Sequence, residues 1–371
     1  MRTMREKIRV LVADDSAFMR RCLCDILESD GDIEVIDTAR DGQEAVEKVL
    51  KHRPDVVTLD INMPRMDGLT ALQYIMALSP CPVIIISSLT TEGAMTTFEA
   101  LELGAFDFVA KPGGTVSLGI KEIGREIVEK VKAAFLSARK PKSGRLLREK
   151  TLESRKSGPS GRGKDISAPK NVGEIIVVIG VSTGGPKTLM EILPRLPDGF
   201  PAVVLVVQHM PPGFTESFAK RLDQCCSLPV REAVDGAKLE RGTITVAKGG
   251  WHLLVKRDKS SGLMASLSQE PEDALYKPSV NVTMRSVIES VEGKNIIGVL
   301  LTGMGDDGAD MMVEIKRRGG FTIAESEETS VVFGMPKAAI ERKGADIVAP
   351  SYKIADIIIK RVNECVRGQD K

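Results

Sequence analysis

The segment VLVADDSAFMR, residues 10–20, decides the fold of the first half of this chain. It continues the apolar run Ile8–Ala13, whose length and composition predict a buried strand. Two carboxylates, Asp14 and Asp15, follow at once, and the next stretch, Ala17–Ser29, repeats its apolar residues at the helical period. A strand that leads directly into a helix is the repeating unit of an α/β fold.

Strand and helix patterns go on alternating as far as residue 139. The further apolar runs that predict strands are Ile33–Ala39, Val56–Asp60, Val83–Ser87 and Phe106–Ala110, and Gly119–Arg139 closes the series as a long helix. Because parallel strands need a crossover between them, this alternation predicts a doubly wound parallel sheet with helices on both faces. Ligands of such sheets bind at the carboxyl ends of the strands.

Polar residues stand where these predicted strands end. Asp14 and Asp15 follow the first strand and Asp60 ends the third, so three carboxylates meet at one edge. Ser87 ends the fourth strand and Lys111 follows the fifth. The carboxylates repel one another unless a cation lies between them, and hard oxygen ligands suit Mg2+, while a lysine suits a phosphoryl oxygen. In the alternative interpretation each aspartate only caps the helix that follows it.

The whole chain has the composition of a soluble globular protein. Its 371 residues include 52 Lys and Arg against 51 Asp and Glu, a net charge of +1, and only 4% are aromatic. These values argue against nucleic-acid binding over the whole surface or on stacked aromatic side chains. The sequence has no apolar run of roughly 20 residues and no signal-peptide pattern, so we expect a cytoplasmic protein without membrane insertion.

One segment departs from this balance of charge. Between Arg139 and Lys170 we count 11 Lys and Arg against three Asp and Glu, a local charge of +8, together with twelve Gly, Pro or Ser. A segment with so little apolar surface does not offset the entropy cost of ordering it. We expect residues 139–172 to form a flexible basic linker between a domain at 1–138 and a second domain at 173–371.

The second domain begins with another strand–turn–helix pattern. The predicted strands of its core are Ile175–Ile179, Ala202–Val207 and Ile296–Leu301, and a β-rich insertion contains Ile244–Val246, His252–Val255 and Leu263–Leu267. This order predicts a second doubly wound α/β domain that carries a β insertion.

A serine, a histidine and an aspartate each follow a strand of this predicted core. Ser182 lies in Gly180-x-Ser182-x-Gly184, which fits the nucleophile elbow between a strand and a helix. A serine nucleophile needs a base and the base needs an orienting carboxylate, for which His209 and Asp307 are the candidates. The same turn also fits a helix N-terminus that binds a phosphate, with Ser182 as its cap.

Four blocks of the first domain carry a resemblance to a known family. They are VLVADDSAFMR, VVTLDINMPRMDG, IIISSLT and AFDFVAKP, and by them residues 5–138 resemble the flavodoxin-like receiver domain of two-component systems. The resemblance implies that Asp60 accepts a phosphoryl group. The other roles that it implies are Mg2+ binding by Asp14, Asp15, Asp60 and the backbone carbonyl of Asn62, phosphoryl binding by Ser87 and Lys111, and a switch aromatic at Phe108.

Five blocks of the second domain carry a second resemblance, namely GVSTGG, VVQHMPPGFTESFAKRLD, YKPSVNV, VLLTGMGDDGAD and VVFGMPKAAI. By these blocks the chain is similar to the CheB-type protein-glutamate methylesterases of bacterial chemotaxis. The resemblance implies that Ser182 is the nucleophile, His209 the general base and then acid, and Asp307 the residue that orients the imidazole. It also implies that Thr183 lies beside the nucleophile and that Met304 belongs to the loop whose amides form the oxyanion hole.

The function implied is hydrolysis of γ-glutamyl methyl esters on the cytoplasmic domains of chemoreceptors, with release of methanol and without a cofactor in the esterase reaction. The chemotaxis histidine kinase is the implied phosphodonor, and phosphorylation at Asp60 is expected to relieve a block of the active site by the receiver. Deamidation of receptor glutamines stays open, because the same triad serves both reactions. The alternative is a response regulator whose output domain binds a partner without catalysis.

A few residues depart from the family pattern. Asp306 precedes Asp307, which leaves open which carboxylate pairs with His209, although the alignment of the following residues favours Asp307. Asn281 stands where an aspartate is common. His252 lies in a predicted β segment, and we interpret it as structural or groove-lining.

Overall fold

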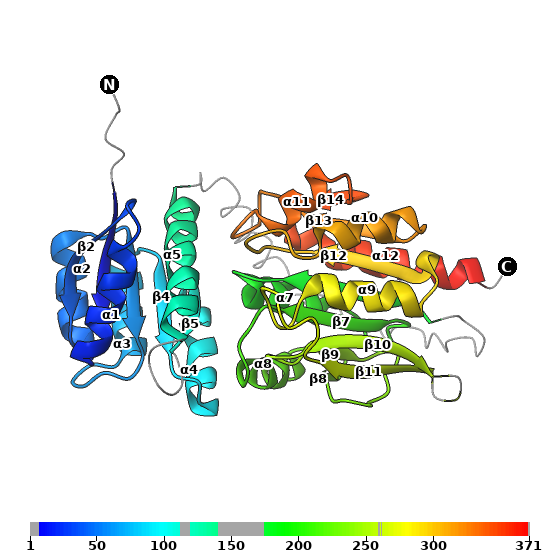
Figure 1. Ribbon diagram of the computed structural model, residues 1–371, viewed down its shortest axis with the longest axis horizontal. Helices are drawn as coiled ribbons and strands as arrows, with labels where there is room; N and C mark the ends of the chain where they lie inside the picture. The colour runs from blue at the N-terminus through cyan, green and yellow to red at the C-terminus, as the bar shows by residue number, and fades with distance from the viewer. Residues whose placement is uncertain (1–6, 112–118, 140–173, 259, 261, 370–371) are drawn as a thin grey trace, which may run out of the picture. The chain divides into compact units, whose positions relative to one another are not determined.

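The computed structural model describes residues 7–111, 119–139, 174–258, 260 and 262–369 (Figure 1). The predicted linker at 139–172 lies, except for Arg139, outside the described residues. The chain divides into two compact units, Met1–Lys140 and Pro141–Lys371, and each is described by itself. Among the described helices of both units, none is long and apolar enough to cross a membrane.

The first unit contains a five-stranded parallel sheet in the order β2-β1-β3-β4-β5. Its elements are β1 (Ile8–Ala13), α1 (Ala17–Glu28), β2 (Ile33–Ala39), α2 (Gly42–His52), β3 (Val56–Asp60), α3 (Gly68–Leu78), β4 (Val83–Ser87), α4 (Thr91–Glu102), β5 (Asp107–Ala110) and α5 (Gly119–Ala138). Helix α1 packs beside α5, and α3 packs beside α2 and α4, so the helices form two layers around the sheet (Figure 1). The predicted doubly wound fold is confirmed, with element ends that differ by one residue.

Helices α1 to α4 follow residues whose side chains accept a hydrogen bond from the first turn. The caps of α1, α2, α3 and α4 are Ser16, Asp41, Asp67 and Thr90. Asp14, Asp15 and Asp60 are not among these caps. The alternative interpretation, in which each aspartate at a strand end caps the next helix, is therefore wrong.

The second unit contains a seven-stranded parallel sheet in the order β14-β13-β12-β6-β7-β9-β8 and a separate antiparallel hairpin, β10-β11. Its elements are β6 (Ile176–Val181), α7 (Gly185–Ile192), η1 (Leu193–Arg195), β7 (Val203–Gln208), α8 (Phe214–Asp223), β8 (Val230–Glu232), β9 (Ile244–Val246), β10 (His252–Asp258), β11 (Gly262–Ser268), α9 (Val280–Ser290), η2 (Gly293–Asn295), β12 (Ile296–Leu300), α10 (Ala309–Arg317), β13 (Phe321–Glu325), α11 (Met335–Glu341), β14 (Ile347–Ala349) and α12 (Ser351–Gln369). The predicted α/β fold with a β insertion is confirmed.

The insertion is smaller than the sequence indicates. Ile244–Val246 joins the main sheet as β9, between β7 and β8, and only β10 and β11 form the hairpin. All three residues of β9 are buried. A buried strand this short shows no alternation of apolar and polar residues, so its pattern does not tell a strand of the main sheet from a strand of the insertion.

Strand β6 runs two residues beyond its predicted end, because Gly180 and Val181 continue the pairing with β7. Helix α7 then begins at Gly185, and its N-cap is Gly184, at a φ of 77° and with no hydrogen bond from a capping side chain. Ser182 therefore does not cap this helix. The interpretation that used Ser182 as the cap of a phosphate-binding helix is wrong.

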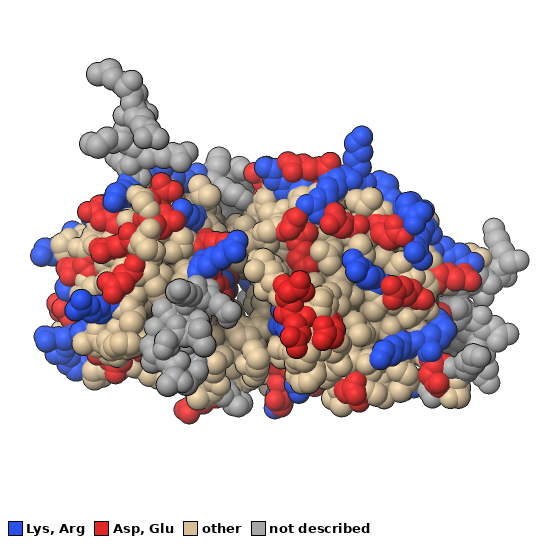
Figure 2. Space-filling view, in the orientation of Figure 1, with Lys and Arg blue, Asp and Glu red and all other residues tan. Residues whose placement is uncertain are grey.

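The central strands of both sheets are covered on both faces. Every residue of β3, β4, β6, β7 and β12 is buried. Strands of this kind appear in the sequence as continuous apolar runs, which is why they could be predicted. On the surface in view in Figure 2, acidic and basic side chains are interspersed, as expected for a net charge of +1.

Candidate functional site

An acidic cluster occupies the carboxyl edge of the sheet in the first unit. One carboxylate oxygen from each of Asp14, Asp15 and Asp60 lies within 4.8 Å of the others, and Asp14 and Asp60 are buried. The Nζ atom of Lys111 is 2.9 Å from a carboxylate oxygen of Asp14 and 2.9 Å from one of Asp60. Three negative charges thus face one positive charge, and the donors are the hard oxygens that Mg2+ prefers. The residues fit a divalent cation.

The pKa of Asp60 points the same way. Burial of its carboxyl group raises the pKa above the ordinary value, the nearby Asp14 and Asp15 raise it further, and Lys111 opposes the shift. The charged form of Asp60 is therefore destabilised where it stands. A cation between the carboxylates removes this repulsion.

Two other predicted residues of this site are already engaged within the unit. The buried hydroxyl of Ser87 donates to the carbonyl oxygen of Gly93 at 3.1 Å and accepts from Thr97 at 2.7 Å. The ring of Phe108 is buried and meets Phe98 edge to face, with 6.4 Å between the ring centroids. Asn62 is exposed in the loop after β3. The structure thus brings the three aspartates and Lys111 together, with Ser87 at the end of the adjacent strand β4.

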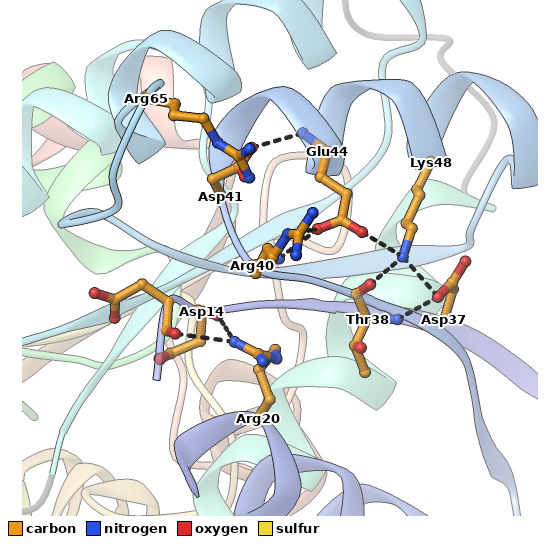
Figure 3. A network of polar contacts seen from close by, with 10 residues as sticks. Asp14, Arg20, Asp37, Thr38, Arg40, Asp41, Glu44, Lys48 and Arg65 are labelled. Atoms are coloured by element: carbon orange, nitrogen blue, oxygen red, sulfur yellow. Dashed lines mark hydrogen bonds and ion pairs between the residues drawn. The ribbon is translucent and has the colours of Figure 1, made fainter. Parts of the chain in front are cut away.

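The residues that hold the loop after Asp60 were not predicted from the sequence. Arg65 forms an ion pair with the buried Asp41, whose other oxygen accepts from the amide of Glu44 at 2.9 Å (Figure 3). The carbonyl of Met66 accepts from the first amide of α2 at 3.0 Å. The loop is therefore tied to the N-terminus of α2. Asp41 carries the pattern of a helix cap, but nothing in the sequence pairs it with Arg65.

Arg20 holds the other side of the cluster through the backbone. Its guanidinium group donates to the carbonyl oxygens of Asp14, at 2.8 Å, and Asp15, at 3.0 Å (Figure 3). These bonds fix the peptide groups that carry two of the three carboxylates. The carboxylates themselves stay available at the edge of the sheet.

In the second unit, neighbouring parallel strands bring Ser182 and His209 to one edge. Val181 pairs with Gln208 in the register of β6 and β7, so the next residue of each strand emerges at the same level. The amide of His209 donates to the carbonyl of Val181 at 3.1 Å, and the amide of Ser182 donates to the carbonyl of Thr302 at 3.0 Å. The loop after β12, which carries Asp307, is thereby joined to the serine.

His209 and Asp307 form a buried pair. Their Nε2 and Oδ2 atoms are 2.8 Å apart, and the two side chains are only 6% and 9% exposed. The Nδ1 atom of His209 is buried and has no hydrogen-bond partner within the described parts of the chain. Because Asp307 occupies Nε2, Nδ1 is the ring nitrogen left to take up a proton. Tyr276 stacks on the imidazole, with 4.0 Å between ring centroids and 12° between planes.

Asp307 receives its other hydrogen bonds from the beginning of α9. Its oxygens accept from the hydroxyl of Ser279 at 3.0 Å, the amide of Val280 at 2.7 Å and the amide of Asn281 at 2.9 Å. Burial alone raises the pKa of this carboxyl group, but the hydrogen bonds from His209 and these amides hold it below its ordinary value. The positive end of the helix dipole acts in the same direction. Asp307 is thus built to stay ionised.

The neighbouring Asp306 has a different partner. It is exposed and forms an ion pair with Arg342, which also contacts Asp310 at 2.9 Å. Of the two adjacent carboxylates, the structure places Asp307 against His209.

The loop after β12 passes close to the serine through a glycine. A Cβ atom on Gly303 would lie 2.7 Å from the Cβ of Ser182, so only glycine leaves room there. Thr302 donates its hydroxyl to the carbonyl of the buried Thr183 at 2.9 Å, and Met304 follows Gly303 half-buried. Of the predicted oxyanion residues, Thr183 follows the serine in sequence, and Met304 follows the glycine that approaches the serine. Thr302 joins that loop to Thr183.

Three residues of this site were not predicted. Tyr276 and Ser279 contact the pair directly, and the buried Gln208 donates to the carbonyl oxygens of Ser182 and His209, each at 3.0 Å. Ser279 shows the pattern of a helix cap before an apolar run. The contact between that cap and Asp307, 28 residues away, has no local signal.

Comparisons with known proteins agree with this division into two sites. Residues 177–358 match the family model described as CheB methylesterase, and residues 10–119 match that of the response regulator receiver domain. A protein of Caldanaerobacter subterraneus subsp. tengcongensis named protein-glutamate methylesterase/protein-glutamine glutaminase is 68% identical over 368 residues, which cover 99% of this chain and all of the relative. One of the same name from Pyrococcus horikoshii is 46% identical, covering 99% of this chain and 97% of the relative.

Among solved structures, the chain is similar to the methylesterase catalytic domain of Thermotoga maritima CheB. The identity is 45% and the TM-score 0.49, over 51% of this chain and 99% of that one. The response regulator domain of the same Thermotoga protein is 49% identical, with a TM-score of 0.34, over 37% of this chain and all of that one.

Proposed function

Because the chain belongs to the CheB methylesterase family and carries a response regulator receiver domain, we propose that it is a protein-glutamate methylesterase of chemotactic adaptation. Its reaction hydrolyses γ-glutamyl methyl esters of chemoreceptors, releases methanol and restores the glutamate carboxylate. Phosphorylation of the receiver activates it.

The ester reaction is assigned to Ser182, His209 and Asp307. His209 takes the serine proton on Nδ1 while Oγ of Ser182 attacks the ester carbonyl, and Asp307 stabilises the imidazolium through Nε2. The C–O bond to the methoxy group then breaks, and the proton on Nδ1 leaves with methanol. Water, deprotonated by the same nitrogen, hydrolyses the acyl-enzyme and frees the serine.

The negative charge on the ester oxygen needs hydrogen-bond donors. We assign these to backbone amides beside Thr183 and in the loop of Met304, because this loop runs against the serine at Gly303. The amide of Gly303 itself donates to the carbonyl of Val332 at 3.0 Å. The loop is thereby held in place by bonds that do not involve the substrate.

The acidic cluster of the first unit is assigned to phosphoryl transfer, with Asp60 as the acceptor and the chemotaxis histidine kinase as the donor. Asp14, Asp15 and Asp60, with the carbonyl of Asn62, would hold Mg2+, which supplies charge neutralisation on the transferring group. Lys111 contacts Asp60 and is placed to bind a phosphoryl oxygen. Ser87, at the end of β4, is assigned to hydrogen bonding with the phosphoryl group, and Phe108 to the switch.

The names of the relatives add a second reaction. Deamidation of a glutamine follows the same steps, with ammonia as the leaving group in place of methanol, and no residue beyond the three catalytic ones is required. We therefore propose that receptor glutamines are also substrates. The partners assigned to this chain are the cytoplasmic domains of chemoreceptors and the kinase.

The observation that carries the proposal is the buried pair of His209 and Asp307 at the sheet edge where Ser182 emerges. Ser182→Ala tests it in a methanol-release assay on methylated receptor. We expect loss of methanol release with unchanged phosphorylation of Asp60 from a phosphodonor. Unchanged methanol release would favour the alternative, an output domain that binds a partner without catalysis.

A further inference from the structure

His252 is the second buried histidine of the esterase unit, and the reaction described above does not use it. It is fully buried at the first position of β10, the strand that packs along α9 (Figure 1). Its Nδ1 accepts from the backbone amide of Ser279 at 3.2 Å, and its Nε2 lies 3.3 Å from the carbonyl oxygen of Pro271. It therefore does not line a groove, as one interpretation of the sequence held.

These two contacts define the tautomer of the imidazole ring. A backbone amide only donates and a carbonyl oxygen only accepts, so Nδ1 carries the lone pair and Nε2 the proton. Burial lowers the pKa of His252 below the ordinary value, which favours the neutral ring. A protonated ring would place two donors, one of them at Nδ1, against the amide of Ser279.

Ser279 connects this ring to the catalytic carboxylate. Its amide goes to His252, and its hydroxyl donates to Oδ1 of Asp307 at 3.0 Å and accepts from the amide of Val282 at 3.4 Å as the cap of α9. The next two amides of the chain also donate to Asp307. Every hydrogen bond that Asp307 receives from α9 thus depends on where Ser279 is held.

We propose that His252 is a positioning residue of the esterase reaction, which fixes Ser279 through Nδ1 and thereby aims Asp307 at Nε2 of His209. The proposal rests on the proposed function, because it concerns the same triad. His252 does not touch the substrate. It acts through three contacts in turn, His252 with Ser279, Ser279 with Asp307, and Asp307 with Nε2 of His209. The other ring nitrogen of His209, Nδ1, is the base.

Two substitutions of His252 test its two hydrogen bonds one at a time, because each keeps a different one of them. The amide oxygen of asparagine takes the place of Nδ1, so His252→Asn keeps the acceptor for Ser279. The amide nitrogen of glutamine takes the place of Nε2, so His252→Gln keeps the donor for Pro271 and loses that acceptor. We expect His252→Gln to lower kcat about 10- to 100-fold with little change in KM, as for a small misplacement of a catalytic group. His252→Asn should restore most of the rate.

The full chain is assayed for methanol release from methylated receptor with a phosphodonor, and thermal unfolding is followed for each variant. A role in folding alone predicts that both variants lose thermal stability and activity together. Equal kcat values for His252→Gln and His252→Asn, whether both low or both near the wild-type value, overturn the proposal.

Ser279→Ala supplies a second test that leaves the buried histidine in place. It removes the hydroxyl that donates to Asp307, and we expect a loss of kcat of similar size. In the double variant with His252→Gln the two losses should not add, because both act on Asp307 through the same contacts. Additive losses contradict the proposal. Wild-type chain without methanol release would instead overturn the proposed function, which the positioning role presupposes.

Discussion

Asp60 and Asp307 stand at the carboxyl edges of two parallel sheets in one chain, and their surroundings shift the two pKa values in opposite directions. Burial and two neighbouring carboxylates raise the pKa of Asp60, with Lys111 as the opposing cation. Asp307 is buried too, but its hydrogen bonds from a histidine and helix amides lower its pKa. Both carboxyl groups are buried, so their hydrogen-bond and charge partners decide whether the pKa rises or falls.

The difference explains how one sheet geometry serves two chemistries. The cluster around Asp60 has more negative than positive charge, and in the proposed function a cation and a phosphoryl group complete it. The site of Asp307 is complete within its own unit, because each oxygen has protein donors and the remaining task is to hold an imidazole. The first site has an excess of negative charge that a bound cation would offset, whereas the carboxylate of the second site has its hydrogen-bond donors within its own unit.

The largest expected effect comes from Asp307→Asn. The amide keeps the shape of the side chain but removes the charge that stabilises the imidazolium of His209. We expect kcat for methanol release to fall about 10⁴-fold, the size known for such a change in a serine triad. Phosphorylation of Asp60 is the internal control and should be unchanged. A loss below tenfold would remove Asp307 from the triad.

Gly303→Ala tests the close approach of the loop to the serine. The added Cβ would meet the Cβ of Ser182 at 2.7 Å and would lie closer still to the Sδ of Met335, so the loop must shift. We expect a loss of kcat of about 100-fold, as for a displacement of about 1 Å at a catalytic group. Gly31→Ala is the matched control, because a Cβ there meets nothing within 4 Å. Equal rates for the two variants would contradict the described loop.

Asp60→Ala tests whether the first site controls the second. We expect the variant to lose the increase in methanol release that a phosphodonor produces, while basal release persists, because Ser182 and its partners are untouched. Rates are measured with and without phosphodonor.

Chelation of Mg2+ should act on the wild-type chain as Asp60→Ala does, and basal release should again persist. If a phosphodonor still stimulates methanol release fully in Asp60→Ala, or stimulates it in the wild-type chain after chelation, the acidic cluster is not the phosphorylation site.

The smallest expected effect is on the stability of each folded unit. The ionised carboxylate stabilises the unit at Asp307 and destabilises it at Asp60. Asp307 stabilises its unit above the ordinary carboxyl pKa of about 4, and this contribution is lost as the pH falls through its lower folded pKa. The raised pKa of Asp60 means that the fold favours its protonated form, a contribution lost as the pH rises through that pKa.

At pH 7 without divalent metal, we therefore expect Asp307→Asn to lower the Tm of the second unit and Asp60→Asn to raise that of the first, each by roughly 2–4 °C. Calorimetry records both transitions. Because the single tryptophan, Trp251, lies in the second unit, a transition followed at this residue is the unfolding of that unit. Shifts of the same sign would contradict the comparison.

Much of both sites could be predicted from the sequence because parallel strands bring their ends to one edge. Buried strands such as β4 and β7 are apolar except for their last residue, so the residues at and after their ends, including His209, could be placed together from the order of the strands alone. Asp307 lies seven residues beyond β12, and there the strand pattern alone did not separate it from Asp306.

What escaped prediction depends on contacts between distant segments. Ser279 is recognisable as a helix cap, but its bond to Asp307 and the bond from its amide to His252 join residues 28 and 27 positions apart. Arg65 and Asp41 are 24 positions apart and carry no common pattern. Such pairs are set by how helices and loops pack on the sheet, which hydrophobic periodicity does not encode.

The most direct test of a phosphorylation-activated esterase with Ser182 as nucleophile is the rate of methanol release from methylated chemoreceptor by the full chain, with Mg2+, before and after addition of a phosphodonor. We expect methanol release to rise when the phosphodonor is added and to disappear in Ser182→Ala under both conditions. Release that is the same in wild type and Ser182→Ala, or a wild-type chain that releases no methanol, would contradict it.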